Sequence, residues 1–269
     1  MTKIITIYCE GKRGSHDFDI LDKIIGDIAG IRPIGGKRGA NAIIEFVEKG
    51  ATTSDFYLFF RDRDFDCGVP PSEKLYFDGK KSYYSYRTTI ENYLFDTSLF
   101  FRFIDEKNMS SKYNINNEND VKNIFIEVAK EIKYYQAVRH TLGKLRIPNT
   151  FSTTWVNGGS GHLPSELDLE HCQTNGWELI HDVVSKNNKE WVDSNFKSTL
   201  DEFLELFDDQ FFDGLKFLIY YQGKDFAKAL TNRLPQFPLK DYYKFAKEFF
   251  DYKKFGDLVE LRKIVKKEM

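Results

Sequence analysis

The apolar run at residues 56–60 (FYLFF) constrains the fold most, because it is short and ends abruptly in charged residues. A run of this kind is typical of a buried strand in a parallel sheet. Two carboxylates, Asp62 and Asp64, follow it, and residues two apart face the same side of an extended chain. Such a pair favours a cation between the two charges, and Mg²⁺ binds through a few carboxylates while keeping positions open for water and phosphate. Taken alone, the pair is more typical of two loop acids that cap a strand, and it is two further carboxylates that favour the metal site.

Glu10 is the second acid placed at the end of an apolar run. Residues 4–9 are rich in β-branched side chains, and Glu10-Gly11 follows them. A helical pattern then begins, with Ser15 as its N-cap. Strand, acid, turn and helix open an α/β unit, in which ligands bind beyond the carboxyl ends of the strands. We therefore expect Glu10, Asp62 and Asp64 at one edge of a single sheet.

Glu91 lies within an otherwise apolar and aromatic stretch, residues 88–94. A carboxylate in such surroundings is either a ligand or half of a salt bridge, for which Arg87 is the nearest base. The sequence leaves both interpretations open.

The predicted architecture is α/β, with a mainly parallel sheet in residues 1–95 and a largely helical region in residues 96–269. The further strands expected in the first part lie at 31–34, 75–77 and 83–86, and a further helix at 40–47 ends at Gly50. The second part is expected to hold a loop at 108–120, helices at 121–146, 177–212 and 241–267, an irregular loop at 148–166, and a strand at 215–221 that returns to the sheet.

Composition narrows the function classes. The chain has 269 residues and a formal net charge of −2, so it is not a generally basic nucleic-acid coat. Its three cysteines, Cys9, Cys67 and Cys172, have no zinc-ligand spacing and fit a reducing cytoplasm. No apolar run is long enough to span a membrane and no signal peptide is evident, so a cytoplasmic location without membrane attachment is expected.

Two Gly-Lys-Arg-Gly tetrads carry candidate phosphate ligands, Lys12 with Arg13 and Lys37 with Arg38. Basic side chains beside helix starts suit phosphate, although either tetrad alone is more typical of a solvated turn. Gly223-Lys224 lacks the spacing and the Ser/Thr of a P-loop, so no ATP site is expected in this chain. Lys224 is either a cation for a transition state or a surface lysine.

The ordered motifs resemble those of the TOPRIM superfamily. More narrowly, the chain is similar to TOPRIM proteins found beside ABC-type ATPases in anti-phage loci, such as the effector of the PARIS defence system, and to OLD-type nucleases. The matching segments are Ile7–Gly11, Phe60–Asp66, Thr89–Leu94 and Gly223–Asp225.

This resemblance implies a TOPRIM-like Rossmannoid core and a Mg²⁺-dependent nuclease, with Mn²⁺ as a substitute metal. Glu10, Asp62 and Asp64 would hold the metal, Glu91 and Lys224 would be catalytic, and Asp17 would be a further acid whose spacing is disturbed by an insertion. The implied substrate is RNA such as tRNA, and the implied partner is the ABC-type ATPase. The resemblance is also compatible with a homodimer as the active form. A DNA endonuclease and a non-catalytic module that docks on the ATPase are the alternatives, with an Asp-x-Asp phosphatase a distant third.

Overall fold

The computed structural model describes residues 4–35, 56–145, 152–184 and 189–269, together with residues 43, 45, 46 and 49. The chain divides into two compact units. The first comprises Met1–Arg63, Val69–Leu94 and Ala246–Met269, and the second comprises Asp64–Gly68 and Phe95–Phe245. This division differs from the predicted single boundary after residue 95, because the C-terminal segment belongs to the first unit.

A five-stranded sheet of order β2-β1-β3-β5-β4 forms the centre of the first unit. The strands are β1 (Ile5–Cys9), β2 (Gly30–Pro33), β3 (Phe56–Arg61), β4 (Tyr76–Phe77) and β5 (Ser82–Tyr84). β1 pairs in parallel with β2 and β3, β3 pairs in parallel with β5, and the edge strand β4 pairs antiparallel with β5. The predicted α/β class with a mainly parallel sheet is confirmed.

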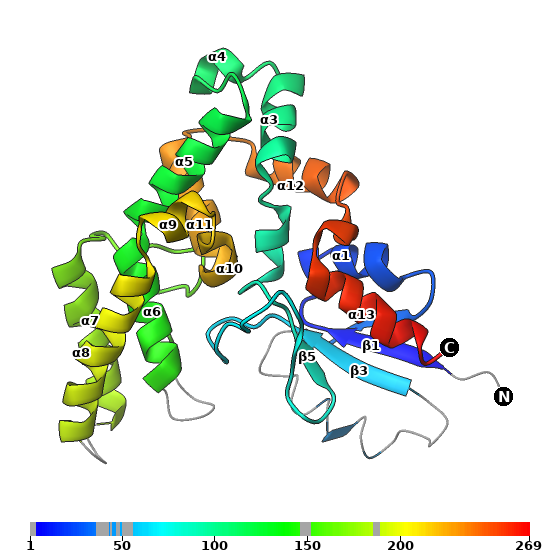
Figure 1. The fold of residues 1–269 in the computed structure, drawn as a ribbon, viewed down its shortest axis with the longest axis horizontal. Helices are drawn as coiled ribbons and strands as arrows, with labels where there is room; N and C mark the ends of the chain where they lie inside the picture. The colour runs from blue at the N-terminus through cyan, green and yellow to red at the C-terminus, as the bar shows by residue number, and fades with distance from the viewer. Residues whose placement is uncertain are drawn as a thin grey trace. The chain divides into compact units, whose positions relative to one another are not determined.

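Two helices, α1 (His16–Ile25) and α13 (Gly256–Lys266), lie side by side in the first unit (Figure 1). The hydroxyl of Ser15 accepts a hydrogen bond from the Phe18 N–H at 3.4 Å, so the predicted N-cap is confirmed. Arg262 of α13 binds the carboxylate of Asp27 through two hydrogen bonds of 2.6 Å each. The first unit also contains two 3₁₀ turns, η1 (Ile90–Leu94) and η2 (Tyr252–Lys254).

The second unit is helical. Its helices are α3 (Thr97–Glu106), α4 (Ser110–Tyr113), α5 (Glu118–Glu131), α6 (Lys133–Leu145), α7 (Leu169–Val184), α8 (Lys189–Leu206), α9 (Asp209–Asp213), α10 (Phe217–Tyr220), α11 (Gly223–Arg233) and α12 (Leu239–Glu248), the last of which runs on into the first unit. Aromatic side chains fill its core, among them Phe95, Phe100, Phe125, Phe226 and Tyr242.

The predicted strand at 215–221 is wrong. Leu215 adopts a left-handed conformation (φ 53°) and the helix α10 follows it. Phe217 and Tyr221 pack against each other and against Phe226 and Phe211 of the same helical unit. A short apolar run suits a buried helix as well as a buried strand, and here the helical neighbours decide between them.

Two long predicted helices are each interrupted. The one at 121–146 divides at Ile132 into α5 and α6, and the one at 241–267 divides into α12, η2 and α13. The predicted loop at 108–120 contains the single-turn helix α4. Apart from isolated positions, the predicted helix at 40–47 and its end at Gly50 lie outside the described residues. No helix in the described part of the chain is long and apolar enough to cross a membrane.

Candidate functional site

Three parallel strands of the first unit end at one edge of the sheet. Cys9 of β1 is paired with Phe60 of β3, and Arg61 is paired with Tyr84 of β5. Glu10 follows β1 directly, Asp62 follows β3, and the loop at residues 85–94 follows β5. This edge therefore carries two of the predicted carboxylates at the ends of adjacent strands.

The turn after Glu10 requires a glycine. Gly11 has φ 85°, a conformation that side chains rarely adopt. A Cβ at this position would come within 2.4 Å of the Ser15 hydroxyl oxygen and 3.2 Å of a carboxylate oxygen of Asp17. The Glu10-Gly11 pair thus turns the chain tightly from β1 into α1, and it brings the carboxylate of Asp17 against that turn.

Glu10 forms an ion pair with Arg61. The Arg61 Nε donates to Glu10 Oε1 at 3.1 Å, and the Arg61 and Glu10 side chains are 9% and 14% exposed. Arg61 also donates to the hydroxyl of Tyr84 at 3.3 Å, and its guanidinium carbon lies 5.4 Å from the centre of the Tyr84 ring. Arg61 lies inside the matching segment Phe60–Asp66, but nothing in the sequence distinguishes it from a basic residue at a solvent-facing strand end.

Asp62 is anchored to the loop that follows β5. Its Oδ1 accepts a hydrogen bond of 2.8 Å from the backbone N–H of Ile90, at the start of η1. The next residue, Arg63, is 1% exposed and fixes the same loop, donating to the Tyr86 carbonyl at 3.2 Å and to the Thr88 hydroxyl at 3.0 Å. The buried arginine is therefore structural, while Asp62 remains partly exposed at the edge.

Glu91 lies in η1 and is 5% exposed. Asp257 of α13 binds two residues of the segment that leads into and contains this 3₁₀ turn, Tyr86 and Tyr93. Asp257 accepts a hydrogen bond from the Tyr86 N–H at 2.9 Å and another from the hydroxyl of Tyr93. Burial raises the pKa of the Asp257 carboxyl and, together with the neighbouring Asp257 charge, raises the pKa of Tyr93 well above its usual range.

The strand on which the same-side prediction for Asp62 and Asp64 rests is shorter than expected, because β3 ends at Arg61. Asp64 adopts a left-handed conformation (φ 47°) and begins the segment Asp64–Gly68, which belongs to the second unit. Within the described residues, no three His, Cys, Asp or Glu side chains form a group that could hold a metal ion. The predicted ligand set Glu10, Asp62 and Asp64 is accordingly not assembled as one cluster.

The donor chemistry at the edge still fits a hard divalent cation. Mg²⁺ takes oxygen ligands and is usually bound by one or two carboxylates, with water and substrate phosphate completing its shell. Glu10 and Asp17 both lie close enough to Cys9 to act on it. Burial first, and then the charges of these two carboxylates, raise the pKa of the Cys9 thiol to about 12. The arginine on Glu10 shows that this carboxylate already accepts a cation.

The predicted phosphate ligands are placed in part. Lys12 and Arg13 are exposed in the turn between Gly11 and α1, where the Lys12 carbonyl accepts from the Ser15 N–H at 2.9 Å. Lys37 and Arg38 lie outside the described residues.

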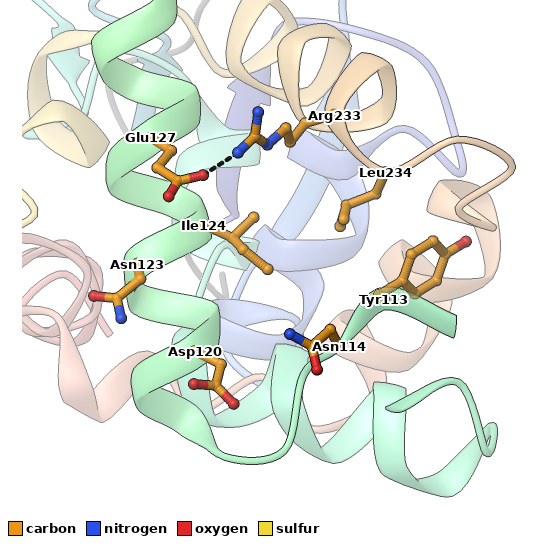
Figure 2. A pocket seen from close by; sticks show the side chains of 8 residues that line it. All are labelled: Tyr113, Asn114, Asp120, Asn123, Ile124, Glu127, Arg233 and Leu234. Atoms are coloured by element: carbon orange, nitrogen blue, oxygen red, sulfur yellow. Dashed lines mark hydrogen bonds and ion pairs between the residues drawn. The ribbon is translucent and has the colours of Figure 1, made fainter. Parts of the chain in front are cut away.

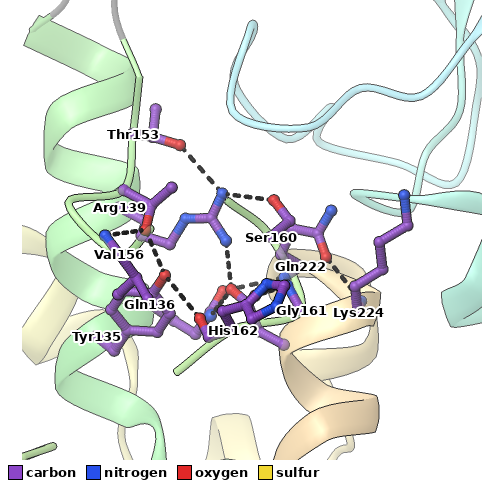
Figure 3. Close-up of polar contacts among 12 residues, drawn as sticks. Tyr135, Gln136, Arg139, Thr153, Val156, Ser160, Gly161, His162, Gln222 and Lys224 are labelled. Atoms are coloured by element: carbon purple, nitrogen blue, oxygen red, sulfur yellow. Dashed lines mark hydrogen bonds and ion pairs between the residues drawn. The ribbon is translucent and has the colours of Figure 1, made fainter. Parts of the chain in front are cut away.

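Lys224 is the second residue of α11 in the second unit, and it is exposed. Its N–H donates to the side chain of Gln222, the N-cap of that helix, at 2.7 Å. In Figure 3 the Lys224 side chain points away from the polar network around Arg139.

Asp225, the last residue of the Gly223–Asp225 motif, has a structural role. It is fully buried and forms an ion pair with Arg139. The same carboxylate accepts from the Gln136 amide at 2.8 Å and from the Gly161 N–H at 2.7 Å. The other guanidinium nitrogen of Arg139 donates to the hydroxyls of Thr153 and Ser160, at 3.2 and 3.0 Å (Figure 3). This network fixes the glycine-rich loop at residues 157–161 against α6 and α11.

A pocket of about 290 Å³ lies elsewhere in the second unit (Figure 2). Its lining residues are Tyr113, Asn114, Asp120, Asn123, Ile124, Glu127, Arg233 and Leu234. Asp120 accepts a hydrogen bond of 2.8 Å from the Asn116 N–H just before α5. Glu127 forms an ion pair with Arg233 among the lining residues (Figure 2). None of the predicted site residues that the structure describes lines this pocket.

Comparison of the chain with models of known protein families and with curated proteins found no match.

Proposed function

We propose that this chain is a metal-dependent nuclease of the TOPRIM type that cleaves phosphodiester bonds. The observation that supports the proposal best is the placement of Glu10 and Asp62 directly after adjacent parallel strands, with the carboxylate of Asp17 beside the Glu10-Gly11 turn. Ligands of open α/β sheets bind at this edge.

Each residue at the carboxyl edge of the sheet has its own role in the proposed reaction. Glu10 and Asp62 bind Mg²⁺ or Mn²⁺, Asp64 follows in the chain as a third acid, and Glu91 is a further acid on the loop that binds Asp62. When bound, the metal polarises a phosphoryl oxygen and activates the attacking water. Lys12 and Arg13 are exposed and bind a neighbouring phosphate of the substrate. The role of Lys224 rests on the family resemblance alone.

The substrate and the partners are also proposed from the resemblance. They are an RNA such as tRNA, in the cytoplasm, and an ABC-type ATPase of an anti-phage system that keeps the nuclease silent, with a homodimer as a candidate active form. The formal net charge of −2 favours local contacts with a small structured nucleic acid over extensive binding along DNA.

A second candidate is a non-catalytic module that docks on the ATPase. Two observations favour it: the described carboxylates form no three-membered metal group, and Glu10 is already neutralised by Arg61. In this case the acids at the sheet edge stabilise the fold and bind no metal.

The first experiment incubates the purified chain with total tRNA and with plasmid DNA, in Mg²⁺ and in chelator. Glu10→Gln keeps the shape of the side chain and removes its charge, and we expect it to lower Mg²⁺-dependent cleavage at least about 100-fold. Glu127→Gln, which alters an exposed ion pair of the second unit, is the matched control and should cleave as the unmodified chain does.

Each outcome separates the candidates. Equal cleavage by Glu10→Gln contradicts the proposed site, whereas cleavage of DNA alone keeps the site and changes the substrate. If neither substrate is cut, thermal unfolding with and without Mg²⁺ decides. A Glu10-dependent rise in the midpoint indicates a latent metal site, and no rise favours the module.

A further inference from the structure

We propose that Arg61 is an internal counter-cation that occupies Glu10 when no metal is bound, and that it thereby sets the Mg²⁺ concentration at which the site fills. The inference rests on the proposed function, because it concerns the same carboxylate. It assigns a positioning role to a residue that is neither one of the acids nor a predicted phosphate ligand.

The position of Arg61 follows from the strand order. β3 lies between β1 and β5, and Arg61 is its last residue. Its side chain donates to Glu10, the residue after β1, at 3.1 Å, and to the hydroxyl of Tyr84 on β5 at 3.3 Å. The guanidinium is therefore placed at the centre of the edge where the proposed metal ligands begin.

Arginine suits this role because it remains charged at every pH that a protein tolerates. Arg61 is 8% exposed, and the side chain of its partner Glu10 is 14% exposed. A carboxylate so nearly buried is costly to leave without a cation. The Arg61 charge removes that cost in the absence of metal. Tyr84 provides a second partner, a hydroxyl and an aromatic face, that Arg61 keeps when Glu10 changes partner.

Metal and guanidinium compete for the same carboxylate. The Arg61 Nε engages Glu10 Oε1, so a divalent cation must either displace this hydrogen bond or bind beside a like charge. Both alternatives weaken metal binding. The apparent affinity of the site for Mg²⁺ is consequently lower than the acids alone would give.

The competition predicts effects of opposite sign. Removing the Arg61 charge should destabilise the metal-free protein and at the same time tighten Mg²⁺ binding. An arginine that only supports the fold would behave differently, since its loss would loosen the edge and weaken both properties. The sign of the change in Mg²⁺ affinity therefore distinguishes the two roles.

The test measures the Mg²⁺ dissociation constant by calorimetry, and the thermal midpoint with and without Mg²⁺, for the full chain and its variants. Arg61→Met keeps an unbranched side chain without charge, and we expect its dissociation constant to be about tenfold lower, with a lower midpoint in chelator. Arg61→Lys keeps the charge and should stay within about threefold of the unmodified chain. Arg102→Met, which breaks the exposed pair with Glu106 on α3, should change neither quantity.

Weaker or unchanged Mg²⁺ binding by a folded Arg61→Met overturns the inference and leaves the proposed function intact. If that variant does not fold, Arg61→Gln is measured instead, since glutamine can still donate to Glu10, and the same tightening is expected. Absence of Mg²⁺ binding in every variant, the unmodified chain included, overturns the proposed metal site and the inference with it. Loss of binding in Glu10→Gln alone shows that the site exists and that the Arg61 comparison is valid.

Discussion

The two units each contain a carboxylate paired with an arginine, but the two pairs are built differently. Asp225 of the helical unit is fully buried, and its two oxygens accept from Arg139, Gln136 and the Gly161 N–H. Glu10 of the sheet unit meets Arg61 at 3.1 Å, and its side chain is 14% exposed. A carboxylate surrounded on all sides by donors serves the fold, whereas one that faces both an arginine and solvent can still exchange its cation.

A second difference concerns what holds each region in place. In the helical unit the ion pair itself joins α6, α11 and the glycine-rich loop. In the sheet unit Asp257 takes the structural role, because it binds the loop whose Ile90 N–H donates to Asp62. Asp62 is thereby held at the sheet edge while it stays partly exposed.

Substitution of Asp225 should have the largest effect on stability. Asp225→Ala leaves the Arg139 charge buried without its carboxylate, and we expect a loss of about 3–5 kcal/mol in the free energy of unfolding. Denaturant unfolding followed by circular dichroism measures it. Glu127→Gln, at an exposed ion pair of the same unit, should cost at most about 1 kcal/mol. Equal losses in the two variants would contradict the structural role of the buried pair.

Tyr93→Phe tests the support behind the sheet edge and should have an intermediate effect. It removes a hydroxyl that donates to Asp257 and accepts from the Arg87 N–H at 3.1 Å. We expect a loss of about 1.5–3 kcal/mol in the free energy of unfolding, because one of the two partners is a carboxyl group. The control is Tyr113→Phe, whose hydroxyl donates to the Pro235 carbonyl at an exposed position. A Tyr93→Phe chain as stable as this control would show that the hydrogen bond to Asp257 does not hold the loop.

Asp257→Asn should mainly change how the free energy of unfolding depends on pH, with a smaller effect on its value at low pH. Burial raises the pKa of Asp257, so the folded chain binds this proton more tightly than the unfolded chain does. The stability that the group contributes is present in full below its unfolded pKa of about 4, and it is lost as the pH rises through the higher folded value.

The asparagine keeps an oxygen for the Tyr86 N–H and the Tyr93 hydroxyl but cannot ionise. We expect it to gain stability relative to the unmodified chain as the pH rises from about 4 toward neutrality. Urea unfolding across this range measures the difference, and parallel profiles would contradict it. Glu73 is a minor contributor of the same sign, because its pKa is raised first by burial and then by the Asp257 charge.

The sequence predicts the sheet of the first unit well, because its signals are local. The apolar runs that become β1 and β3 and the N-cap Ser15 all act through their immediate neighbours. Glu10 and Asp62 could be assigned to one edge because parallel strands end together.

Long-range contacts are what the sequence could not reveal. Nothing near Asp225 in the chain shows that Arg139 and Gly161 enclose it, so the Gly223–Asp225 motif suggested a site and not a buried ion pair. The apolar run at 56–60 also does not show that β3 ends at Arg61 or that Asp64 adopts a left-handed conformation. Likewise, the amphipathic pattern of the last segment indicates a helix but not that Asp257 binds the loop after β5.

The attachment of that loop by α13 has a consequence for the order in which the protein is made. Tyr86 and Asp257 are 171 residues apart in the chain, and the segment Phe95–Phe245 of the helical unit is synthesised between them. At about 5–20 residues per second, the ribosome needs on the order of 10–30 s to add the residue that holds the sheet edge in place. A chain released before α13 by a premature stop codon would carry Glu10, Asp62 and Glu91 without the Asp257 contact to the loop that binds Asp62. The completed edge is thus restricted to chains whose translation has passed α13.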